Sequence, residues 1–365
     1  MTSGAKPKAF GTGLIALDLV LGLDPASPVG SWAGGTCGNV LSILSYLGWE
    51  TYPVARMNGD PASERVRVDL ARWGVRLDFA SCGPTAHTPI IIQEIRRGLD
   101  GKPRHRFSRS CPNCGQWLPS YKPVTTAAVE TVSPALKGAS VFFLDRLSRA
   151  ALTLAKDAAQ KGAVVVFEPS GKGSEKHMAE AVRVAHIVKY ADQRLAELSG
   201  LMGEDASTIL EVQTLGERGL RYRHRLGRSP SEWMHLDAVM APRLADSCGS
   251  GDWATAGLLA KVAGAGSVGL REASVNNIRG ALRYGQALAA WNCGFEGARG
   301  GMYAVPRDAF DAEIAAVMDG RLRCAGEPLA TIAEEVIVDC PACPPRTAAA
   351  KMPVAAPMRT RVIGE

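Results

Sequence analysis

A short run of small residues that ends in a carboxylate is the part of this chain best suited to chemistry. Residues 246–257 read Asp-Ser-Cys-Gly-Ser-Gly-Asp-Trp-Ala-Thr-Ala-Gly. The backbone N–H groups of Gly249, Ser250 and Gly251 can turn toward one point, and the apolar residues that follow predict a buried helix, so the segment suits an anion. Asp252 would repel that anion, and it is better suited to take a proton from a hydroxyl that attacks a bound phosphoryl group. The alternative is that Asp252 only caps the helix.

A pair of glycines near the N-terminus precedes a second predicted helix. Gly34 and Gly35 are followed by Asn39 and by apolar residues at helical spacing, which end at Gly48. Paired glycines let a ligand approach the backbone closely, and Gly48 suits the C-terminal end of the helix. A strand-like run over 51–57 comes next. An ordinary helix–turn–strand unit would have the same pattern.

A carboxylate also follows the first apolar run of the chain. Residues 10–18 predict a buried strand that ends at Asp18, and open α/β sheets bind ligands at the carboxyl ends of their strands. Gly11 and Gly13 do not form a dinucleotide fingerprint, because position 16 is Ala rather than a third Gly. The chain also lacks a Gly-x-x-x-x-Gly-Lys-Ser/Thr sequence, so neither a Rossmann cofactor site nor a Walker loop is indicated.

Together these segments resemble the ribokinase-like (PfkB-type) carbohydrate kinases. The C-terminal signature of that family reads Asp-Thr-x-Gly-Ala-Gly-Asp-x-Phe-x-x-Gly, and it is matched by Asp246, Gly249, Gly251, Asp252 and Gly257. The departures are Ser247 for Thr, Ser250 for Ala and Ala254 for Phe. The N-terminal signature, Gly-Gly-x-x-x-Asn before a helix, a Leu-Gly, a strand and a Gly-Asp, is matched within 34–60.

The resemblance implies a reaction and assigns residues to it. The γ-phosphoryl group of ATP would pass to a hydroxyl of a sugar or nucleoside, with Mg²⁺ bridging the phosphates. Asp252 would be the base, and residues 249–252 would form the anion hole. The residues that would bind the acceptor are Asp18, Gly34, Gly35 and Asn39. The other function that we consider is that of a kinase-fold protein with weakened catalysis, acting as a ligand sensor or assembly subunit.

A glycine-bounded turn is expected on the nucleotide side. Residues 212–220 predict two strands joined by a turn, in which Thr214, Gly216 and Gly219 resemble the Thr-x-Gly-x-x-Gly element that lines the nucleotide in the family. Without the resemblance, a plain β-hairpin is an equally good interpretation. The resemblance also implies that Asn292, near the end of an Ala- and Gly-rich helical segment, lines the adenine pocket.

One element departs from the family pattern. The family has an Asn-x-x-Glu that orders Mg²⁺ and phosphate through water, and this chain has Ala191 and Arg194 at those positions. Mg²⁺ prefers carboxylates, water and phosphate oxygens. Three interpretations are open: Glu168 or Asp192 replaces the missing carboxylate, Arg194 contacts the phosphates, or activity is weakened.

The elements between these segments alternate in type. The predicted strands are 139–144, 163–167 and 185–189, and the predicted helices are 149–161 and 176–184. Such alternation predicts a mostly parallel sheet with helices on both faces. We therefore expect a ribokinase-like three-layer α/β/α sandwich over residues 8–320. Within it we expect a small β-lid near 85–124, and after it a C-terminal extension over 321–365 with a disordered tail.

Two Cys-Pro-x-Cys pairs suggest a metal. Cys111 and Cys114 lie in the predicted lid, and Cys340 and Cys343 lie near the C-terminus. Four sulfurs at this spacing suit a tetrahedral structural Zn²⁺ site. The fold would have to bring lid and tail together, within one subunit or across a homodimer. Disulfides suit a reducing cytosol less well, and unpaired thiols are the remaining alternative.

Composition limits the class of protein and its partners. The chain has 365 residues, of which 46% are apolar and 21% charged, as in soluble globular proteins. It has neither an apolar run long enough to span a membrane nor the apolar core of a signal peptide, so we expect a cytoplasmic location. A net charge of +6 suits nucleotides but is too small to indicate nucleic-acid binding. A basic stretch over 102–109 is either a solvated face or a contact for an anionic acceptor or a partner chain.

Overall fold

A nine-stranded sheet forms the centre of the computed structural model, which describes residues 5–24, 29–111, 114–171, 173–195, 206–227 and 229–321. The strand order is β13-β12-β11-β10-β9-β8-β1-β4-β5. The bounds are β1 Lys8–Thr12, β4 Glu50–Met57, β5 Ala80–Cys82, β8 Val141–Leu144, β9 Val164–Phe167, β10 Ile187–Ala191, β11 Leu210–Thr214, β12 Leu220–His224 and β13 Met234–Leu236. From β11 to β5 neighbouring strands are parallel, and β12 and β13 add an antiparallel edge.

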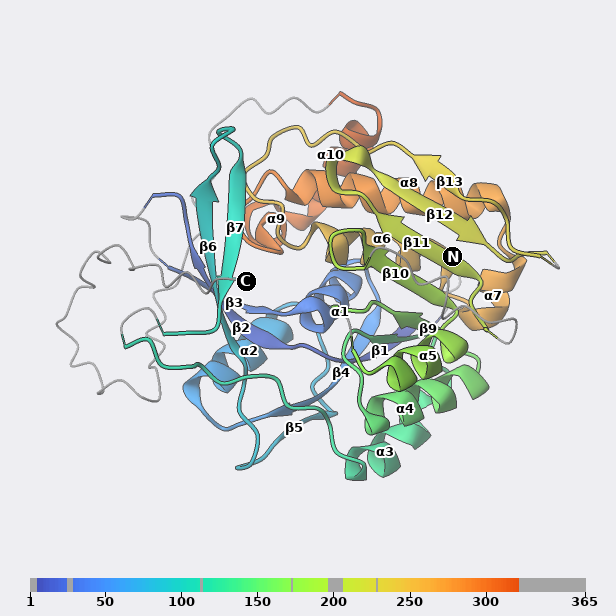
Figure 1. Ribbon diagram of the computed structural model, residues 1–365, viewed down its shortest axis with the longest axis horizontal. Coiled ribbons are helices and arrows are strands. Elements are labelled where there is room, and N and C mark those ends of the chain that lie inside the picture. The colour runs from blue at the N-terminus through green and yellow to red at the C-terminus, as the bar shows by residue number, and fades with distance from the viewer. Residues whose placement is uncertain are drawn as a thin grey trace.

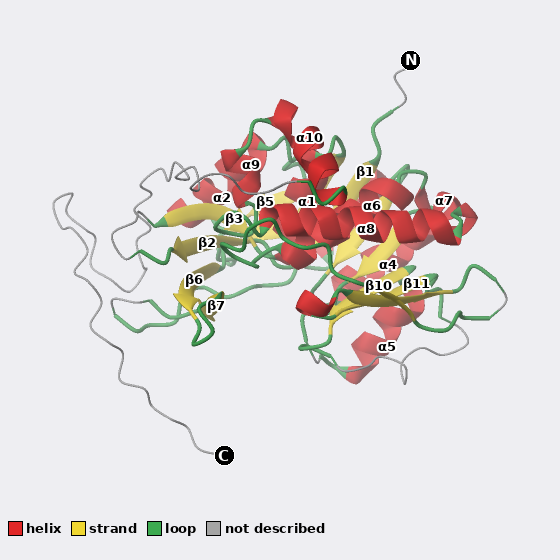
Figure 2. Cartoon of the chain, turned by 90° about the horizontal axis from the view of Figure 1, so that it is seen from above, coloured by secondary structure: helices red, strands yellow, loops and turns green. Residues whose placement is uncertain are grey.

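The central strands are apolar because both of their faces are covered. Every residue of β8 and β9 is buried. Val141 and Phe143 pack into the core on one face of the sheet, whereas Phe142 and Leu144 pack into the core on the other. Helices α1, α6 and α8 cover the first face, and α3, α4 and α5 cover the second (Figure 2). The predicted three-layer α/β/α sandwich is confirmed.

The helices begin and end close to the positions that their sequence predicts. The bounds are α1 Thr36–Tyr46, α2 Pro61–Arg72, α3 Ala127–Val132, α4 Arg149–Gln160, α5 Glu175–Val184, α6 Ser250–Val262, α7 Gly266–Glu272, α8 Val275–Asn292, α9 Gly300–Ala304 and α10 Arg307–Met318. Ser148 caps α4 by accepting a hydrogen bond from the backbone N–H of Ala151 at 3.1 Å. Ser274 and Asn277 form a capping box at the start of α8.

A second, four-stranded sheet stands beside the first and forms the lid (Figure 1). Its order is β3-β2-β6-β7, with bounds β2 Ala16–Leu21, β3 Gly30–Gly34, β6 Ile90–Arg97 and β7 Pro103–Ser108. The prediction of a lid near 85–124 located β6 and β7 but missed β2 and β3. The lid is therefore built from two segments that lie far apart in the chain.

The N-terminal apolar run forms two strands instead of the predicted single one. The break lies at Gly13, which has φ 152°. A Cβ at this position would lie 1.6 Å from Oδ1 of Asp145, and the same oxygen accepts a hydrogen bond from the backbone N–H of Leu14 at 3.0 Å. The chain therefore leaves the large sheet after β1 and enters the lid as β2, so Asp18 lies within a lid strand rather than at the end of a strand of the large sheet.

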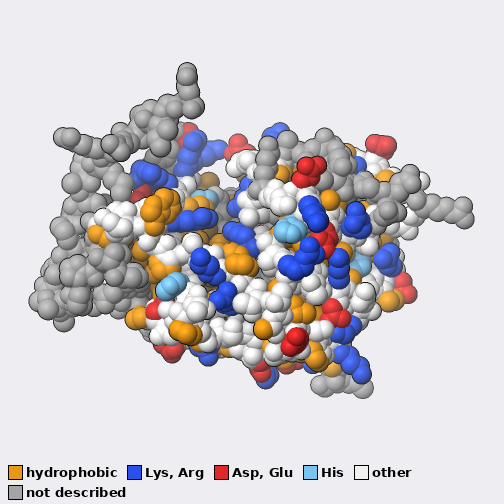
Figure 3. Space-filling view, turned by 60° about the horizontal axis from the view of Figure 1, so that its bottom comes forward, with side chains coloured by type: hydrophobic (Ala, Val, Ile, Leu, Met, Phe, Trp, Pro, Cys, Tyr) orange, Lys and Arg blue, Asp and Glu red, His pale blue; other side chains and the backbone are white. Residues whose placement is uncertain are grey.

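The face of the molecule in Figure 3 has both positive and negative side chains. On the face in Figure 3, Lys and Arg side chains are interspersed with acidic and uncharged ones. Among the described residues, no helix combines the length and apolar character needed to cross a membrane. The expected disordered tail, residues 344–360, lies outside the described part of the chain.

Candidate active site

The turn before α6 has the backbone that the sequence predicts. Gly249 is left-handed, with φ 75°, and α6 begins at Ser250 without a hydrogen bond from a capping side chain. A Cβ at position 249 would lie 2.2 Å from the backbone oxygen of Ala298, so only glycine fits here. Asp252 lies in the first turn of α6 and is not its cap, so the capping alternative is wrong. The uncapped helix start leaves backbone N–H groups for an anion.

Asp252 is buried and is held by a residue of the N-terminal signature. Its carboxylate is 9% exposed, and its Oδ2 accepts a hydrogen bond from Nδ2 of Asn39 at 2.7 Å. Burial raises the pKa of Asp252 to about 7, with a further increase from the charge of Glu168. The hydrogen bond from Asn39 and the positive charges of Lys189 and Arg194 oppose that increase. A carboxylate with a pKa near neutrality is suited to general base catalysis.

A buried ion pair lies next to this carboxylate. Nζ of Lys189, in β10, lies 2.7 Å from Oε1 of Glu168, which follows β9, and the two side chains are 4% and 10% exposed. Oε2 of Glu168 accepts a hydrogen bond from the hydroxyl of Thr255 at 2.7 Å. A Cβ at Gly251 would lie 3.6 Å from Lys189 Nζ, so the pair lies next to the first turn of α6. Lys189 was not predicted as a site residue, although a lysine inside an apolar strand indicates a buried charge with a charged partner.

Asp192 and Arg194, two of the residues considered in place of the missing glutamate, have different surroundings. Asp192 forms an ion pair at 2.7 Å with Arg218, in the turn between β11 and β12. Arg194 lowers the pKa of both Asp252 and Asp145 through its charge. Arg194 therefore adds positive charge to the site, whereas Asp192 is engaged at the hairpin turn.

Asp18 lies against the paired glycines. A Cβ at Gly34 would lie 1.8 Å from Oδ2 of Asp18, and the backbone N–H of Gly35, which has φ 78°, donates to this carboxylate. Burial raises the pKa of Asp18 to about 7, and the bond from Gly35 and the charge of Arg299 oppose that increase. Oδ1 of Asp18 has no hydrogen-bond partner among the described residues. The structure thus brings Asp18, Gly34 and Gly35 together, with one carboxylate oxygen unused.

Asp246 connects the lid to the signature loop. It accepts hydrogen bonds from the backbone N–H groups of Cys248 at 2.9 Å and Gly297 at 3.0 Å. From the lid, Nε2 of Gln93 donates to its Oδ2 at 2.6 Å, and Nδ1 of His105 lies 3.5 Å from its Oδ1. The sequence analysis did not single out Gln93, whose polar side chain on a buried strand position could have indicated an inward contact.

The residues expected on the nucleotide side form a hairpin turn. Gly216 and Gly219 have φ 62° and 92°, and the hydroxyl of Thr214 donates to the backbone oxygen of Tyr190 at 3.5 Å. Asn292 is fully buried, and its Nδ2 donates to the backbone oxygen of Ala298 at 3.1 Å. Its Oδ1 accepts from the backbone N–H of Gly301 at 3.1 Å. These contacts give Asn292 a structural role in the loop before α9, and its predicted contact with adenine stays a prediction.

Only one of the two cysteine pairs lies in the part of the chain that the structure describes. Cys111 is buried and Cys114 is exposed, whereas Cys340 and Cys343 lie outside the described part of the chain. Within residues 5–321, apart from the undescribed gaps, no group of three or more His, Cys, Asp or Glu side chains could hold a metal. The zinc site stays a prediction, and so does a homodimer formed through the lid. Metal analysis of the purified protein and of a variant lacking these cysteines tests the first.

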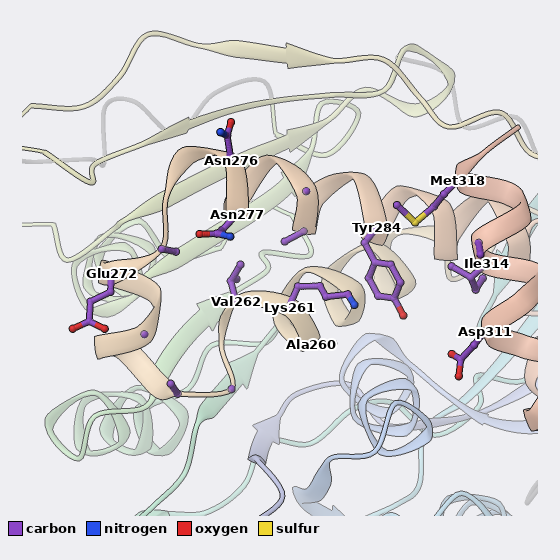
Figure 4. Close-up of a pocket in the computed structure, with 17 residues that line it drawn as sticks. Ala260, Lys261, Val262, Glu272, Asn276, Asn277, Tyr284, Asp311, Ile314 and Met318 are labelled. Atoms are coloured by element: carbon purple, nitrogen blue, oxygen red, sulfur yellow. The ribbon is translucent and has the colours of Figure 1, made fainter. Parts of the chain in front are cut away.

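An open groove of about 850 Å³ lies away from Asp18 and Asp252, between the end of α6 and helices α7, α8 and α10 (Figure 4). Nζ of Lys261 lies there, 4.2 Å from the centre of the Tyr284 ring. Asp252 is in the first turn of α6, and the groove is at the last turn, about 15 Å along the helix axis. The groove is therefore separate from the buried carboxylates.

Comparison with known proteins identifies relatives of this chain. The family model described as pfkB family carbohydrate kinase matches residues 23–303. A protein described as "Probable fructokinase-4" of Arabidopsis thaliana is 24% identical over 246 residues, which are 63% of this chain and 72% of that protein.

Solved structures agree on the fold. A fructokinase with bound ATP from Xylella fastidiosa aligns with a TM-score of 0.65 and 17% identity, over 87% of this chain and 99% of its own. An Arabidopsis thaliana ribokinase with ribose and ATP aligns with a TM-score of 0.62 and 16% identity, over 86% and 99%. A Burkholderia thailandensis nucleoside kinase with inosine aligns with a TM-score of 0.60 and 19% identity, over 86% and 96%. The predicted ribokinase-like fold is confirmed.

Proposed function

The chain belongs to the pfkB family of carbohydrate kinases, and we propose that it transfers the γ-phosphoryl group of ATP to a hydroxyl of a sugar or nucleoside, with Asp252 as the base. The observation that carries the proposal is the buried Asp252 carboxylate, with a pKa raised to about 7, at the uncapped start of α6. The ATP of the fructokinase structure and the inosine of the nucleoside kinase structure support the donor and the range of acceptors.

The described residues suit each part of this reaction. The acceptor hydroxyl loses its proton to Asp252 as its oxygen attacks the γ-phosphorus and the bond to the β–γ bridging oxygen breaks. Asn39 orients the Asp252 carboxylate through its hydrogen bond at 2.7 Å. The backbone N–H groups of residues 249–252 lie at the helix start, where they would stabilise the charge that develops on the phosphoryl group. Among them, the N–H of Ser250 also donates to the backbone oxygen of Ser247 at 3.3 Å.

Mg²⁺ fits this site as part of the nucleotide complex. When bound, it neutralises charge on the phosphates. The charge of Glu168 raises the pKa of Asp252, and the two oxygens of Glu168 accept hydrogen bonds from Lys189 and Thr255. Glu168 is the carboxylate beside Asp252 that would hold Mg²⁺. Lys189 and Arg194 place positive charge on the same side, which suits anionic phosphates.

An ADP-release assay tests the proposal. The wild type is given Mg²⁺–ATP with D-fructose, D-ribose, inosine or 2-dehydro-3-deoxygluconate, next to Asp252→Asn. We expect acceptor-dependent ADP release from the wild type and a loss of roughly 10²- to 10⁴-fold in the variant. The matched control is Asp308→Asn, because Asp308 is an exposed aspartate in the first turn of another helix, α10.

The same assay separates an enzyme from a sensor. Thermal stabilisation by ATP or an acceptor, without ADP release in the presence of any of the four acceptors, would contradict the kinase proposal. It would favour the ligand sensor instead. Near wild-type turnover by Asp252→Asn would remove this residue from the role of base but leave the kinase activity standing.

A further inference from the structure

A small enclosed recess lies next to Asp18, between the lid sheet and the loop before α9. Its lining consists of Asp18, Val20, Trp32, Ala33, Ala298, Arg299 and Tyr303. Asp18 and Val20 come from β2, and Trp32 lies opposite Asp18 on β3, so all three project from one face of the lid. The charged groups of this lining are Asp18 and Arg299. Arg299 was not singled out from the sequence, and the proposed reaction does not yet use it.

Arg299 is held rigidly from one side. Its side chain is 1% exposed, and its Nη2 lies 2.9 Å from Oδ2 of Asp69 and donates to the backbone oxygen of Ala33. Asp69, on α2, also accepts hydrogen bonds from the hydroxyl of Tyr303 at 2.8 Å and the backbone N–H of Ala33 at 2.8 Å. The guanidinium therefore has a fixed position, with its Nη2 edge fully engaged.

Two buried polar atoms beside the recess are unused. Nη1 of Arg299 and Oδ1 of Asp18 have no hydrogen-bond partner among the described residues. Buried polar atoms are almost always satisfied in folded proteins, by the chain, by water or by a ligand. One of these atoms is a donor and the other an acceptor. A hydroxyl group suits both kinds of atom, because it can donate to a carboxylate and accept from a guanidinium.

The charges near the recess favour a neutral ligand. The positive charge of Arg299 is balanced by Asp69 at 2.9 Å, and Asp18 adds a second carboxyl to the lining. A ligand carboxylate would lie against Asp18 and would gain little from an arginine that is already paired. Other lining residues, Val20, Trp32 and Ala298, are apolar and offer a second charge no partner.

We propose that Arg299 is a specificity-determining residue that binds, together with Asp18, a hydroxyl of the acceptor other than the one that Asp252 deprotonates, and that the site selects neutral sugars or nucleosides over sugar acids. This inference rests on the proposed function, since it assigns the class of acceptor to the same site. It adds a positively charged donor that the family signatures do not contain.

Steady-state kinetics with the four acceptors test this role. For the wild type we expect a higher kcat/KM with at least one of D-fructose, D-ribose and inosine than with 2-dehydro-3-deoxygluconate. Arg299→Met should raise the KM of the preferred neutral acceptor by roughly 10- to 100-fold, because a buried charged hydrogen bond is lost, and should leave the KM of ATP unchanged. Arg299→Lys should recover part of the loss. Arg279→Met, at an exposed position on α8, is the matched control.

Two further variants distinguish a loss of acceptor binding from a loss of folding. Arg299→Met leaves Asp69 buried without its ion pair, so Arg299→Met/Asp69→Asn removes both charges and should fold while it retains the raised KM. Asp69→Asn alone leaves Arg299 unbalanced, and it should shift the kcat/KM ratio toward the sugar acid. An unchanged KM in the double variant, or a wild-type preference for the sugar acid, would overturn the proposal.

Failure of the proposed function would be distinguishable. If no acceptor supports ADP release by the wild type, the kinase proposal fails, and thermal stabilisation by the same acceptors decides the role of Arg299. Stabilisation by a neutral acceptor that Arg299→Met/Asp69→Asn loses would support the recess as its binding site. Equal stabilisation of both proteins, or stabilisation of neither, would overturn it.

Discussion

The two ends of the candidate active site each contain a buried ion pair, but the pairs do different work. At the base end, Lys189 and Glu168 lie 2.7 Å apart beside Asp252, and both change the pKa of that carboxylate. At the lid end, Arg299 and Asp69 lie 2.9 Å apart and hold a guanidinium beside the recess at Asp18. The base end thus sets a proton affinity, and the lid end positions a donor.

This difference separates the expected kinetic effects. Changes at the base end should alter kcat and its pH dependence, because they alter the group that we propose as the proton acceptor. Changes at the lid end should alter the KM of the acceptor and leave the pH dependence in place, because they alter groups that we propose bind the acceptor. The predictions below test this separation, in order of decreasing effect.

Breaking the ion pair at the base end should have the largest effect. Lys189→Met leaves Glu168 buried without its cation, which should lower the free energy of unfolding by about 3–5 kcal/mol in urea denaturation. The control is Lys189→Met/Glu168→Gln, which removes both charges and should recover most of the loss. If the double variant is as unstable as the single one, packing rather than charge accounts for the effect.

Removing the partner of Asp252 should shift the pH dependence of kcat. A base works only when it is deprotonated, so wild-type kcat should rise with pH through about 7, the pKa of Asp252. The hydrogen bond from Asn39 lowers that pKa, so Asn39→Leu should move the rise to higher pH and reduce kcat at pH 7 by roughly 10-fold. An unshifted profile would contradict the assignment of the pH dependence to Asp252.

Loosening the lid should change the affinity for the acceptor alone. Gln93→Leu removes the hydrogen bond at 2.6 Å from β6 to Asp246, whose two backbone partners remain. A neutral side-chain bond of this kind contributes about 1 kcal/mol, so the KM of the acceptor should rise roughly 5-fold. The matched control is Gln116→Leu, at an exposed position after β7. A shifted pH profile in Gln93→Leu would show that the two ends are not separate.

The groove on the outer helices should give the smallest effect. Lys261→Met removes the contact with the Tyr284 ring at 4.2 Å, which should change the free energy of unfolding by no more than about 1 kcal/mol. Kinetic constants should stay at wild-type values, because the groove lies at the far end of α6 from Asp252. Altered kcat or KM would mean that this groove is coupled to the site.

The two motifs that meet at Asp252 could be predicted from sequence because each of them is local. Gly249 and Asp252 lie within one turn of each other, and the paired glycines precede Asn39 on the same short segment. Each motif therefore has a single local geometry, a left-handed turn and a helix start, that limits what its residues can do. The parallel sheet then brings the two motifs to a direct contact between Asn39 and Asp252.

At the lid end Asp18 was predicted, but the roles of Arg299 and Gln93 could not be, because their contacts join distant segments. Arg299 meets Asp69 across 230 positions, and Gln93 meets Asp246 across 153. A charged residue between two helices and a glutamine on a strand have many ordinary explanations. The strand break at Gly13 was also hidden, because it depends on the Asp145 carboxylate occupying the space of a side chain. Only the assembled fold reveals that Arg299 and Asp18 line one recess.

The central claim, that Asp252 is the base, is tested most directly by the single-turnover rate of phosphoryl transfer to the preferred acceptor. The rate is measured for the wild type and for Asp252→Asn, on both sides of the pKa of about 7. We predict that the wild-type rate rises with pH through this value, and that the variant is slower by roughly 10²- to 10⁴-fold with no such rise. A variant rate close to that of the wild type, or with the same pH dependence, would contradict the claim.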